Sequence, residues 1–84
     1  MRTIVSIQPL ESYRLLCAFS DGTNKIADTT DYLKGEAFKP LLNIKEFLKI
    51  ENHKYYVVWP NYELDLSADT LWHIGVDIKA ANID

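Results

Sequence analysis

Apolar and polar residues alternate in the first third of the chain, which predicts β-strands because successive strand side chains point to opposite faces. A first strand is expected over residues 2–8, and Pro9 is expected to end it because proline has no N–H for a strand ladder. A second strand is expected over residues 13–20, where every second side chain from Tyr13 to Phe19 is apolar. This second strand should therefore direct one face at a core.

A tight hairpin is predicted at Asp21 and Gly22, which directly follow the second strand. An Asp-Gly pair supplies the positive φ angles that a two-residue hairpin turn requires. Residues 23–27 are expected to return antiparallel to the second strand, with Ile26 facing the core. The first three strands are thus expected to form a meander.

After residue 27 the pattern indicates short helical turns. Residues 28–34 begin with several side chains that can cap a helix, so they are expected to form one turn. Pro40 disfavours helical geometry at the residue before it, which predicts a bent connection over residues 36–42. The apolar side chains of this connection are expected to point inward: Phe38, Leu41 and Leu42.

A second short helix is predicted over residues 44–48. Asn43 and Glu46 have the spacing of a capping box, in which each side chain satisfies a backbone N–H at the start of the helix. Residues 49–51 are compatible with a further strand, and residues 52–54 have the composition of a turn. This arrangement predicts a second hairpin.

The β-branched and aromatic run over residues 55–59 predicts a well-buried strand. Trp59 is expected in the core, with Tyr56 on the opposite face of the strand. Pro60 is expected to stop the pairing directly after Trp59. Ser67 is expected to begin a short helix, because its hydroxyl can accept a backbone N–H of the first helical turn.

The whole chain is expected to form one α+β domain over residues 1–84, since 84 residues leave no room for a second domain. The expected architecture is a small, mainly antiparallel sheet with a three-strand meander, two short helices, a second hairpin and a short C-terminal helix. Residues 75–84 are expected to be either an extended tail or a frayed end. A hydrophobic content of 48% and a charged content of 25% are typical of a folded domain.

Charge and cysteine content narrow the expected partners and compartment. The formal net charge is −3, and the nine Lys and Arg residues are scattered, so nucleic acid is not an expected partner. The single cysteine cannot form an internal disulfide, which favours a reducing compartment, and we expect a cytoplasmic protein. No apolar segment has the length of a signal peptide or a membrane span, so no membrane association is expected.

The sequence contains no motif for catalysis, cofactor binding or metal binding. His53 and His73 stand outside any motif, and Cys17 alternates with apolar residues on a core-facing strand. The carboxylates are not spaced as in a calcium loop, and one cysteine with two separated histidines gives no zinc pattern. The three glycines form no phosphate-binding loop. We therefore expect a protein that is not an enzyme and that holds neither a cofactor nor a metal.

Aromatic and acidic residues in the second half predict a protein-interaction surface, because tyrosine and tryptophan are enriched at such surfaces. The predicted contact residues are Tyr56, Tyr62, Glu63 and Trp72. Acidic neighbours make a small basic protein the expected partner. A chain this short buries only about 60–65% of its unfolded surface, so its core is small and association, as in a homodimer, is favoured.

Two other functions stay open. A dimeric DNA-binding autoregulator would use the helix over residues 67–72 as its contact, although this helix is short and acidic. A small-molecule-binding domain would need a pocket that no pattern in the sequence predicts. Gel-shift binding at physiological salt would favour the first of these two alternatives.

Several short motifs also carry a resemblance to a known family. In chain order they are Phe19-Ser20-Asp21-Gly22, Phe38-Lys39-Pro40-Leu41, Phe47, Trp59-Pro60-Asn61 and residues 65–72. Together they resemble a family of small bacterial proteins described only as a domain of unknown function, over the chain up to about Trp72. The chain departs from this family at Tyr62, where glycine is common, and at Ala68, where proline is frequent.

The resemblance implies a small α+β fold with no established enzymatic activity. It also implies genes that often lie beside another small uncharacterised protein, a neighbourhood that suggests toxin–antitoxin pairs. It supplies no catalytic residues. The matched positions are expected to be structural: Asp21, Gly22, Pro40, Trp59, Pro60 and Ser67.

Overall fold

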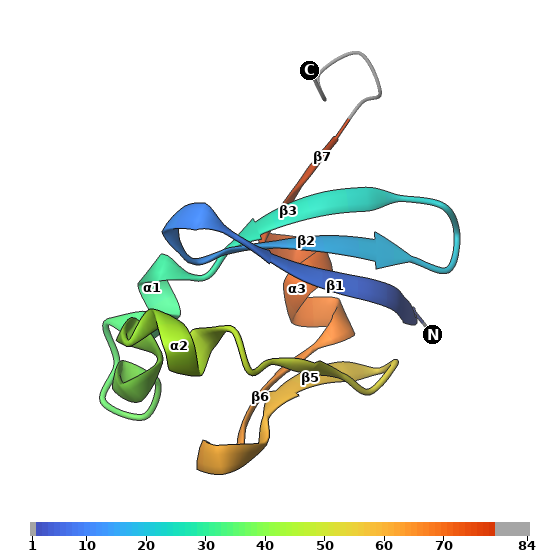
Figure 1. Ribbon diagram of the computed structural model, residues 1–84. Helices are drawn as coiled ribbons and strands as arrows, with labels where there is room; N and C mark the ends of the chain where they lie inside the picture. Colours follow the sequence, from blue (N-terminus) through green and yellow to red (C-terminus); the bar gives the residue numbers. More distant parts are fainter. Residues whose placement is uncertain (1, 79–84) are drawn as a thin grey trace.

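The computed structural model describes residues 2–78, which form two antiparallel sheets and short helices (Figure 1). The first sheet has the order β1-β2-β3-β7, with β1 (Ile4–Leu10), β2 (Arg14–Phe19), β3 (Asn24–Asp28) and β7 (Gly75–Asp77). The second has the order β4-β5-β6, with β4 (Glu51–Asn52), β5 (Tyr56–Trp59) and β6 (Leu64–Ser67). The predicted α+β class and antiparallel pairing are confirmed, but the strands divide into two sheets rather than one.

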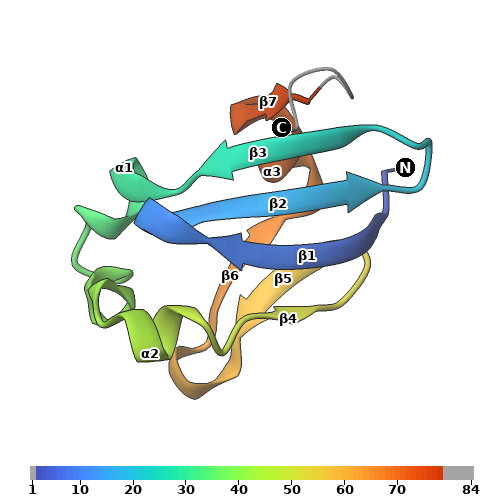
Figure 2. The ribbon, with the colours of Figure 1, turned by 45° about the horizontal axis from the view of Figure 1, so that its top comes forward.

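The helices are short and lie between strands. The α-helices are α1 (Thr30–Leu33), α2 (Ile44–Phe47) and α3 (Ala68–Ile74). The 3₁₀ helices are η1 (Glu11–Tyr13), η2 (Lys39–Leu42) and η3 (Pro60–Tyr62). Figure 2 shows the first sheet face-on, with α3 and the second sheet behind it. One face of the first sheet therefore meets the core, and no described helix covers the other.

The predicted meander and its hairpin are confirmed. Gly22 has a φ of 91°, and the Asp21 carboxylate accepts the backbone N–H of Thr23 at 2.9 Å. The first strand nevertheless continues through Pro9 to Leu10. Pro9 is tolerated because β1 is an edge strand, paired with β2 alone, so its missing N–H breaks no second ladder.

A β-bulge interrupts the pairing of β1 with β2. Ile4 pairs with Phe19 and Ser6 pairs with Ala18, so Val5 is an extra residue without a partner. The bulge keeps Ile4 in the core while Val5 is exposed. The Ile4 N–H donates to the Lys54 carbonyl oxygen at 2.7 Å, which joins the first sheet to the β4–β5 turn.

The prediction for Ile26 was wrong, because Ala27 faces the core and is fully buried. The hairpin register places Ala27 opposite Leu15 and Ile26 opposite Leu16. Since side chains alternate along a strand, this register directs Ile26 to the uncovered face. The register of the hairpin therefore decides which side chain faces the core, although isoleucine would bury more apolar area than alanine.

The core joins the two sheets and α3. Its members are Ile4, Leu15, Cys17, Phe19, Ala27, Leu33, Leu41, Phe47, Val57, Trp59, Leu66, Ala68 and Leu71. Trp59 is only 1% exposed, and its indole Nε1 donates to the Phe47 carbonyl oxygen at 2.8 Å. The predicted core position of Trp59 is confirmed, and its polar atom is satisfied.

The central connection follows the prediction in most respects. The Asn43 side chain caps α2 by accepting the Lys45 N–H at 3.1 Å. The Glu46 half of the predicted capping box was wrong, because the Glu46 carboxylate accepts from Lys49 and Tyr62 instead. Pro40 lies in the first turn of η2, where its fixed φ suits a helical start. Leu41 is buried and Phe38 is half-buried, whereas Leu42 is exposed, so the inward prediction for Leu42 was wrong.

In the second sheet, β5 ends at Trp59 as predicted, and Pro60 begins η3. The chain then re-enters the sheet as β6, a strand that the sequence analysis did not predict. Ser67 caps α3 as predicted, accepting the Thr70 N–H at 3.1 Å. Helix α3 thus begins directly at the end of β6.

Residues 75–77 form β7, which pairs antiparallel with β3. Residues 75–84 were expected to be either extended or frayed, and residues 75–77 are extended. Residues 79–84 lie outside the described residues.

Candidate interaction surfaces

The structure distributes the four predicted contact residues over three places. Tyr56 begins β5 and is 39% exposed, whereas Tyr62 and Glu63 follow the opposite end of that strand. Trp72 lies on α3 and is half-buried. These residues therefore do not form one continuous surface.

The first place is the outer face of the second sheet, here called the acidic face. The register pairs Val58 with Glu51 on one side and with Asp65 on the other, so the three side chains share one row. Alternation along β5 puts Tyr56 on this same face, opposite Ser67. Val57 and Trp59 point to the core from the other face.

A histidine borders the acidic face. The His53 ring stacks on the Tyr56 ring, with the ring centroids 5.3 Å apart, and His53 Nε2 lies 3.1 Å from Glu51 Oε1. The two strand carboxylates, the tyrosine and the histidine thus surround one half-buried valine. The three acidic-face neighbours were not predicted: the expected hairpin gave no register for Glu51 and Val58, and Asp65 lies on β6, which was not expected. The alternation Leu64-Asp65-Leu66-Ser67 was the available signal.

The second place is the corner formed by η3 and α2. The Tyr62 hydroxyl donates to Glu46 Oε1 at 2.8 Å, which ties the corner to the helix. Hydrogen bonds from Lys49 and Tyr62 lower the pKa of Glu46, and the bond to Glu46 raises the pKa of Tyr62. Glu63 is exposed and has a left-handed backbone, with a φ of 54°.

Exposed aliphatic residues lie around this corner. Ile44 begins α2 and Leu48, four residues on, is its C-cap, so the two side chains share one side of the helix. Both are exposed, as is Leu42. No periodic pattern marked them beforehand, because a single helical turn is too short to show one.

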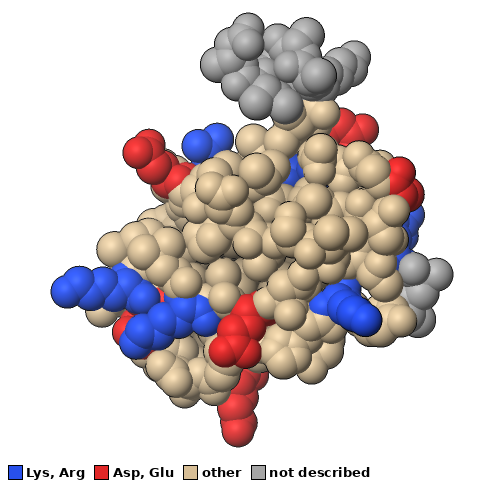
Figure 3. Space-filling model, turned by 45° about the vertical axis from the view of Figure 1, so that its right-hand side comes forward, with Lys and Arg blue, Asp and Glu red and all other residues tan. Residues whose placement is uncertain are grey.

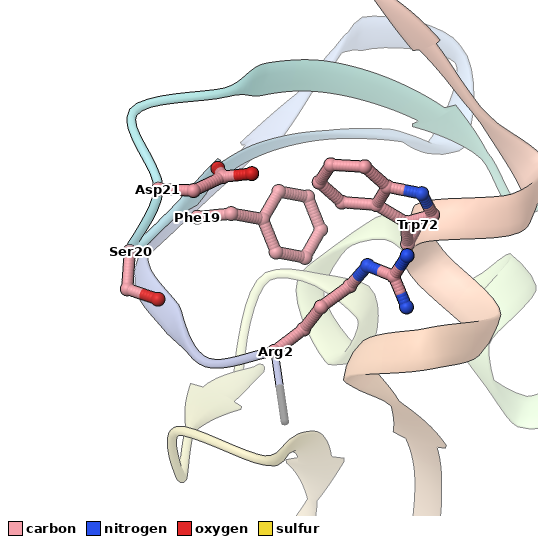
Figure 4. Close-up of a pocket in the computed structure, with 5 residues that line it drawn as sticks. All are labelled: Arg2, Phe19, Ser20, Asp21 and Trp72. Atoms are coloured by element: carbon pink, nitrogen blue, oxygen red, sulfur yellow. The ribbon is translucent and has the colours of Figure 1, made fainter.

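The third place is a hollow beside Trp72, of about 360 Å³. Figure 4 shows its lining: the rings of Phe19 and Trp72 lie side by side, and Arg2 reaches across to Trp72. The two ring centroids are 5.0 Å apart in an edge-to-face arrangement. Asp21 and Ser20 complete the lining from the β2–β3 hairpin.

Charged side chains on the face seen in Figure 3 lie mostly toward its margins, and uncharged residues fill the middle.

Part of the uncovered face of the first sheet is apolar, because Leu16, Ile26 and Val76 share one row across three strands. Among residues 2–78, Val76 is the most exposed large apolar residue, at 71%.

The titratable residues rejected as catalytic lie in different settings. Burial raises the pKa of the Cys17 thiol to about 12, which disfavours the nucleophilic thiolate. His73 is exposed at the end of α3, far along the chain from His53. Among residues 2–78, no three His, Cys, Asp or Glu side chains are grouped so that they could hold a metal ion. The predictions of no metal, no cofactor and no catalysis stay predictions.

None of the helices in the described part of the chain is both long and apolar enough to cross a membrane. No curated protein and no solved structure matches the sequence. One family model does match, over residues 4–77, which is nearly the whole chain and extends beyond the motifs that carried the resemblance. The chain therefore belongs to the family described as Protein of unknown function (DUF2442).

Proposed function

We propose that this chain is a non-enzymatic protein-interaction module whose partner presents basic side chains to the acidic face. The observation that carries the proposal is the row Glu51–Val58–Asp65 across the second sheet. The Glu51 and Asp65 carboxylates lie on opposite sides of the apolar Val58 side chain. A partner lysine or arginine can pair with each carboxylate while an apolar partner residue covers Val58.

Physical considerations favour a basic partner over a neutral one. The chain carries a net charge of −3, which attracts positively charged proteins over a Debye length and raises their association rate. Tyr56 adds a large, rigid contact surface that loses little conformational entropy on binding. Together these features supply both long-range attraction and short-range contact.

The finer proposal is that this partner is the other member of a two-protein pair, with the present chain in the antitoxin-like role. Its support is the resemblance to a family whose genes often lie beside another small protein. Neutralisation would then consist of covering a basic surface of the partner. A homodimer of the present chain is compatible with this role and stays a prediction.

The test compares three forms of the protein, each purified by affinity from the native host. They are the wild type, the Glu51→Gln, Asp65→Asn variant, and a control, Asp31→Asn, Glu36→Gln. The control removes the same charge at side chains that are 91% and 92% exposed and lie outside the acidic face. Mass spectrometry identifies bound protein, and the eluates are assayed for nucleic acid.

We expect a stoichiometric basic protein with the wild type and the control, and at least about tenfold less with the acidic-face variant, since each lost charge pair weakens binding. Equal retention by all three forms would exclude this face. Nucleic acid that shifts in a gel at physiological salt would instead support the DNA-binding alternative.

A further inference from the structure

The Trp72 ring is the site of two cation–π contacts within the chain. The Arg2 guanidinium carbon lies 4.2 Å from the ring centroid, and Lys25 Nζ lies 4.3 Å from it. A guanidinium placed over a tryptophan face is attracted by the negative charge of the ring surface. Two cationic side chains of the chain itself thus contact the Trp72 ring.

The two cations are held very differently. Lys25 has a side chain only 12% exposed, donates to the Trp72 carbonyl oxygen at 3.0 Å and pairs with Asp77 at 3.2 Å. Arg2 precedes β1, has a side chain 41% exposed, and pairs with Asp69 at 3.0 Å, whose side chain is 65% exposed. Lys25 is therefore a fixed part of the fold, whereas Arg2 is held by exposed contacts alone.

We propose that the Trp72 ring, together with Asp69, is a binding site for an arginine side chain of another molecule, that the neighbouring hollow gives access to it, and that Arg2, which also lines the hollow, is the intramolecular occupant of the ring face. An incoming guanidinium takes the place of the Arg2 guanidinium over the ring and pairs with Asp69. Arg2 moves out into solvent. One guanidinium replaces another, so Asp69 keeps a positively charged partner.

The site favours arginine over lysine. A guanidinium is planar, so it can stack on Trp72 and present its N–H groups to a carboxylate at the same time. Asp21 offers a second carboxylate at the edge of the hollow. The Thr23 hydrogen bonds chiefly lower the pKa of Asp21, with a smaller contribution from the charge of Arg2, so the carboxylate stays ionised at neutral pH.

The inference goes beyond the proposed function and can fail separately. The hollow is formed by the β2–β3 hairpin and α3, whereas the acidic face is formed by the strands of the second sheet. Neither Glu51 nor Asp65 lines it. A partner can therefore contact the acidic face while Arg2 still covers the Trp72 ring.

The test uses acetyl-Gly-Arg-Gly-amide as the probe and its citrulline counterpart, which has the same shape without the charge. Binding is followed by NMR through the two indole N–H signals of the folded chain. The Trp72 signal reports on the hollow, and the Trp59 signal is an internal reference because that indole is buried and bonded to Phe47. Wild type, Arg2→Ala and Lys34→Ala are compared. Lys34→Ala also removes one positive charge, from an exposed ion pair with Asp31.

We expect the arginine peptide to shift the Trp72 signal and leave the Trp59 signal in place. Removal of the intramolecular competitor should tighten binding by about 5- to 30-fold in Arg2→Ala, the factor that one exposed cation–π contact and one exposed ion pair represent. Lys34→Ala should change the affinity for the arginine peptide by less than about twofold, because the exposed Lys34 charge is screened by salt. An equal affinity for Arg2→Ala and Lys34→Ala would overturn the proposal, as would an equal shift with the citrulline peptide.

Discussion

Trp59 unites three roles in a single side chain. It fills the core between the second sheet and the helical connection, contacts Phe38 and Phe47, and donates its indole N–H to the Phe47 carbonyl oxygen. The alternation of residues 55–59 was enough to place it inward. The partner of its N–H was not predictable, because it lies twelve residues away in a helix whose position depends on packing.

Replacing Trp59 with alanine should lower the free energy of unfolding by about 3–5 kcal/mol, because it leaves a large cavity and an unpaired carbonyl. Urea denaturation followed by circular dichroism measures the change. Tyr56→Ala is the matched control from the exposed face of the same strand, with an expected loss below about 1 kcal/mol. Similar losses for both variants would contradict the burial of Trp59.

The Cys17 thiol should be almost unreactive in the folded protein. A rise in pKa from 9.0 to about 12 leaves about a thousandfold less thiolate below pH 9, and the fully buried sulfur is also shielded from reagents. Ellman's reagent should therefore label the protein at pH 8 only as fast as it unfolds. The same reaction in denaturing urea supplies the rate of the free thiol, and fast labelling without urea would show an accessible sulfur.

The Tyr62–Glu46 hydrogen bond should stabilise the protein within a defined pH window. The pKa of Glu46 is lowered from 4.5, so its contribution is present above pH 4.5 and is lost as the pH falls through the folded-state pKa. The pKa of Tyr62 is raised from 10.0, so its contribution is present below pH 10.0 and is lost as the pH rises through the folded-state pKa.

Thermal unfolding of wild type and Tyr62→Phe across pH 3–11 measures this window. The stability difference between the two should be largest between the two ordinary pKa values and should shrink at both ends. Tyr55→Phe, at another exposed tyrosine, should show no such profile. A pH-independent difference for Tyr62→Phe would mean that the hydroxyl contributes nothing through Glu46.

At the scale of elements, the signals that succeeded were local. The Asp21-Gly22 turn, the Asn43 and Ser67 caps and the end of pairing before Pro60 each depend on the chemistry of one or two residues. The failures depended on the pairing of neighbouring strands, which no one or two residues determine. The inward face of β3 follows from its register with β2, and β6 exists because β5 offers it an edge. The acidic face was not predicted because β6 was not, although the alternation over residues 64–67 indicated that strand.

Gly75 marks the place where α3 passes into β7 and runs against β3. A Cβ at this position would lie 2.8 Å from the Leu71 carbonyl oxygen and 2.8 Å from Lys25 Cβ. Gly75→Ala should therefore lower the free energy of unfolding by about 1–3 kcal/mol, the usual cost of overpacking, and loosen β7. Hydrogen exchange at residues 75–77 reports the loosening. Gly35→Ala is the control, because its nearest contact would be an ordinary 3.4 Å.

At the scale of the whole molecule, two sheets share one core. Buried residues from the first sheet, the second sheet and α3 belong to a single cluster. One backbone hydrogen bond joins Ile4 to the β4–β5 turn, and the Asn52 side chain donates to the Ile4 carbonyl oxygen. Neither sheet has a separate core to stabilise it, and small domains of this kind unfold cooperatively. The family and the fold class were predictable from sequence at this scale, whereas the division into two sheets was not.

The two sheets should consequently unfold in one transition. Urea curves from circular dichroism, which sees all strands, and from fluorescence, which sees Trp59 in the second sheet and Trp72 on α3, should have coincident midpoints. Separate midpoints would show that the sheets are independent units.

The bulge at Val5 has a consequence for mutation. The side chain at position 5 is exposed and makes little contact, so most substitutions there should be tolerated. Deleting the residue is a different change, because it would remove the bulge and bring Ile4 next to Ser6, where a regular ladder keeps Ile4 opposite Phe19 on the core-facing side of β1. Val5 is therefore dispensable for the register of β1, and its contribution is the local bend and twist that a bulge gives to the strand.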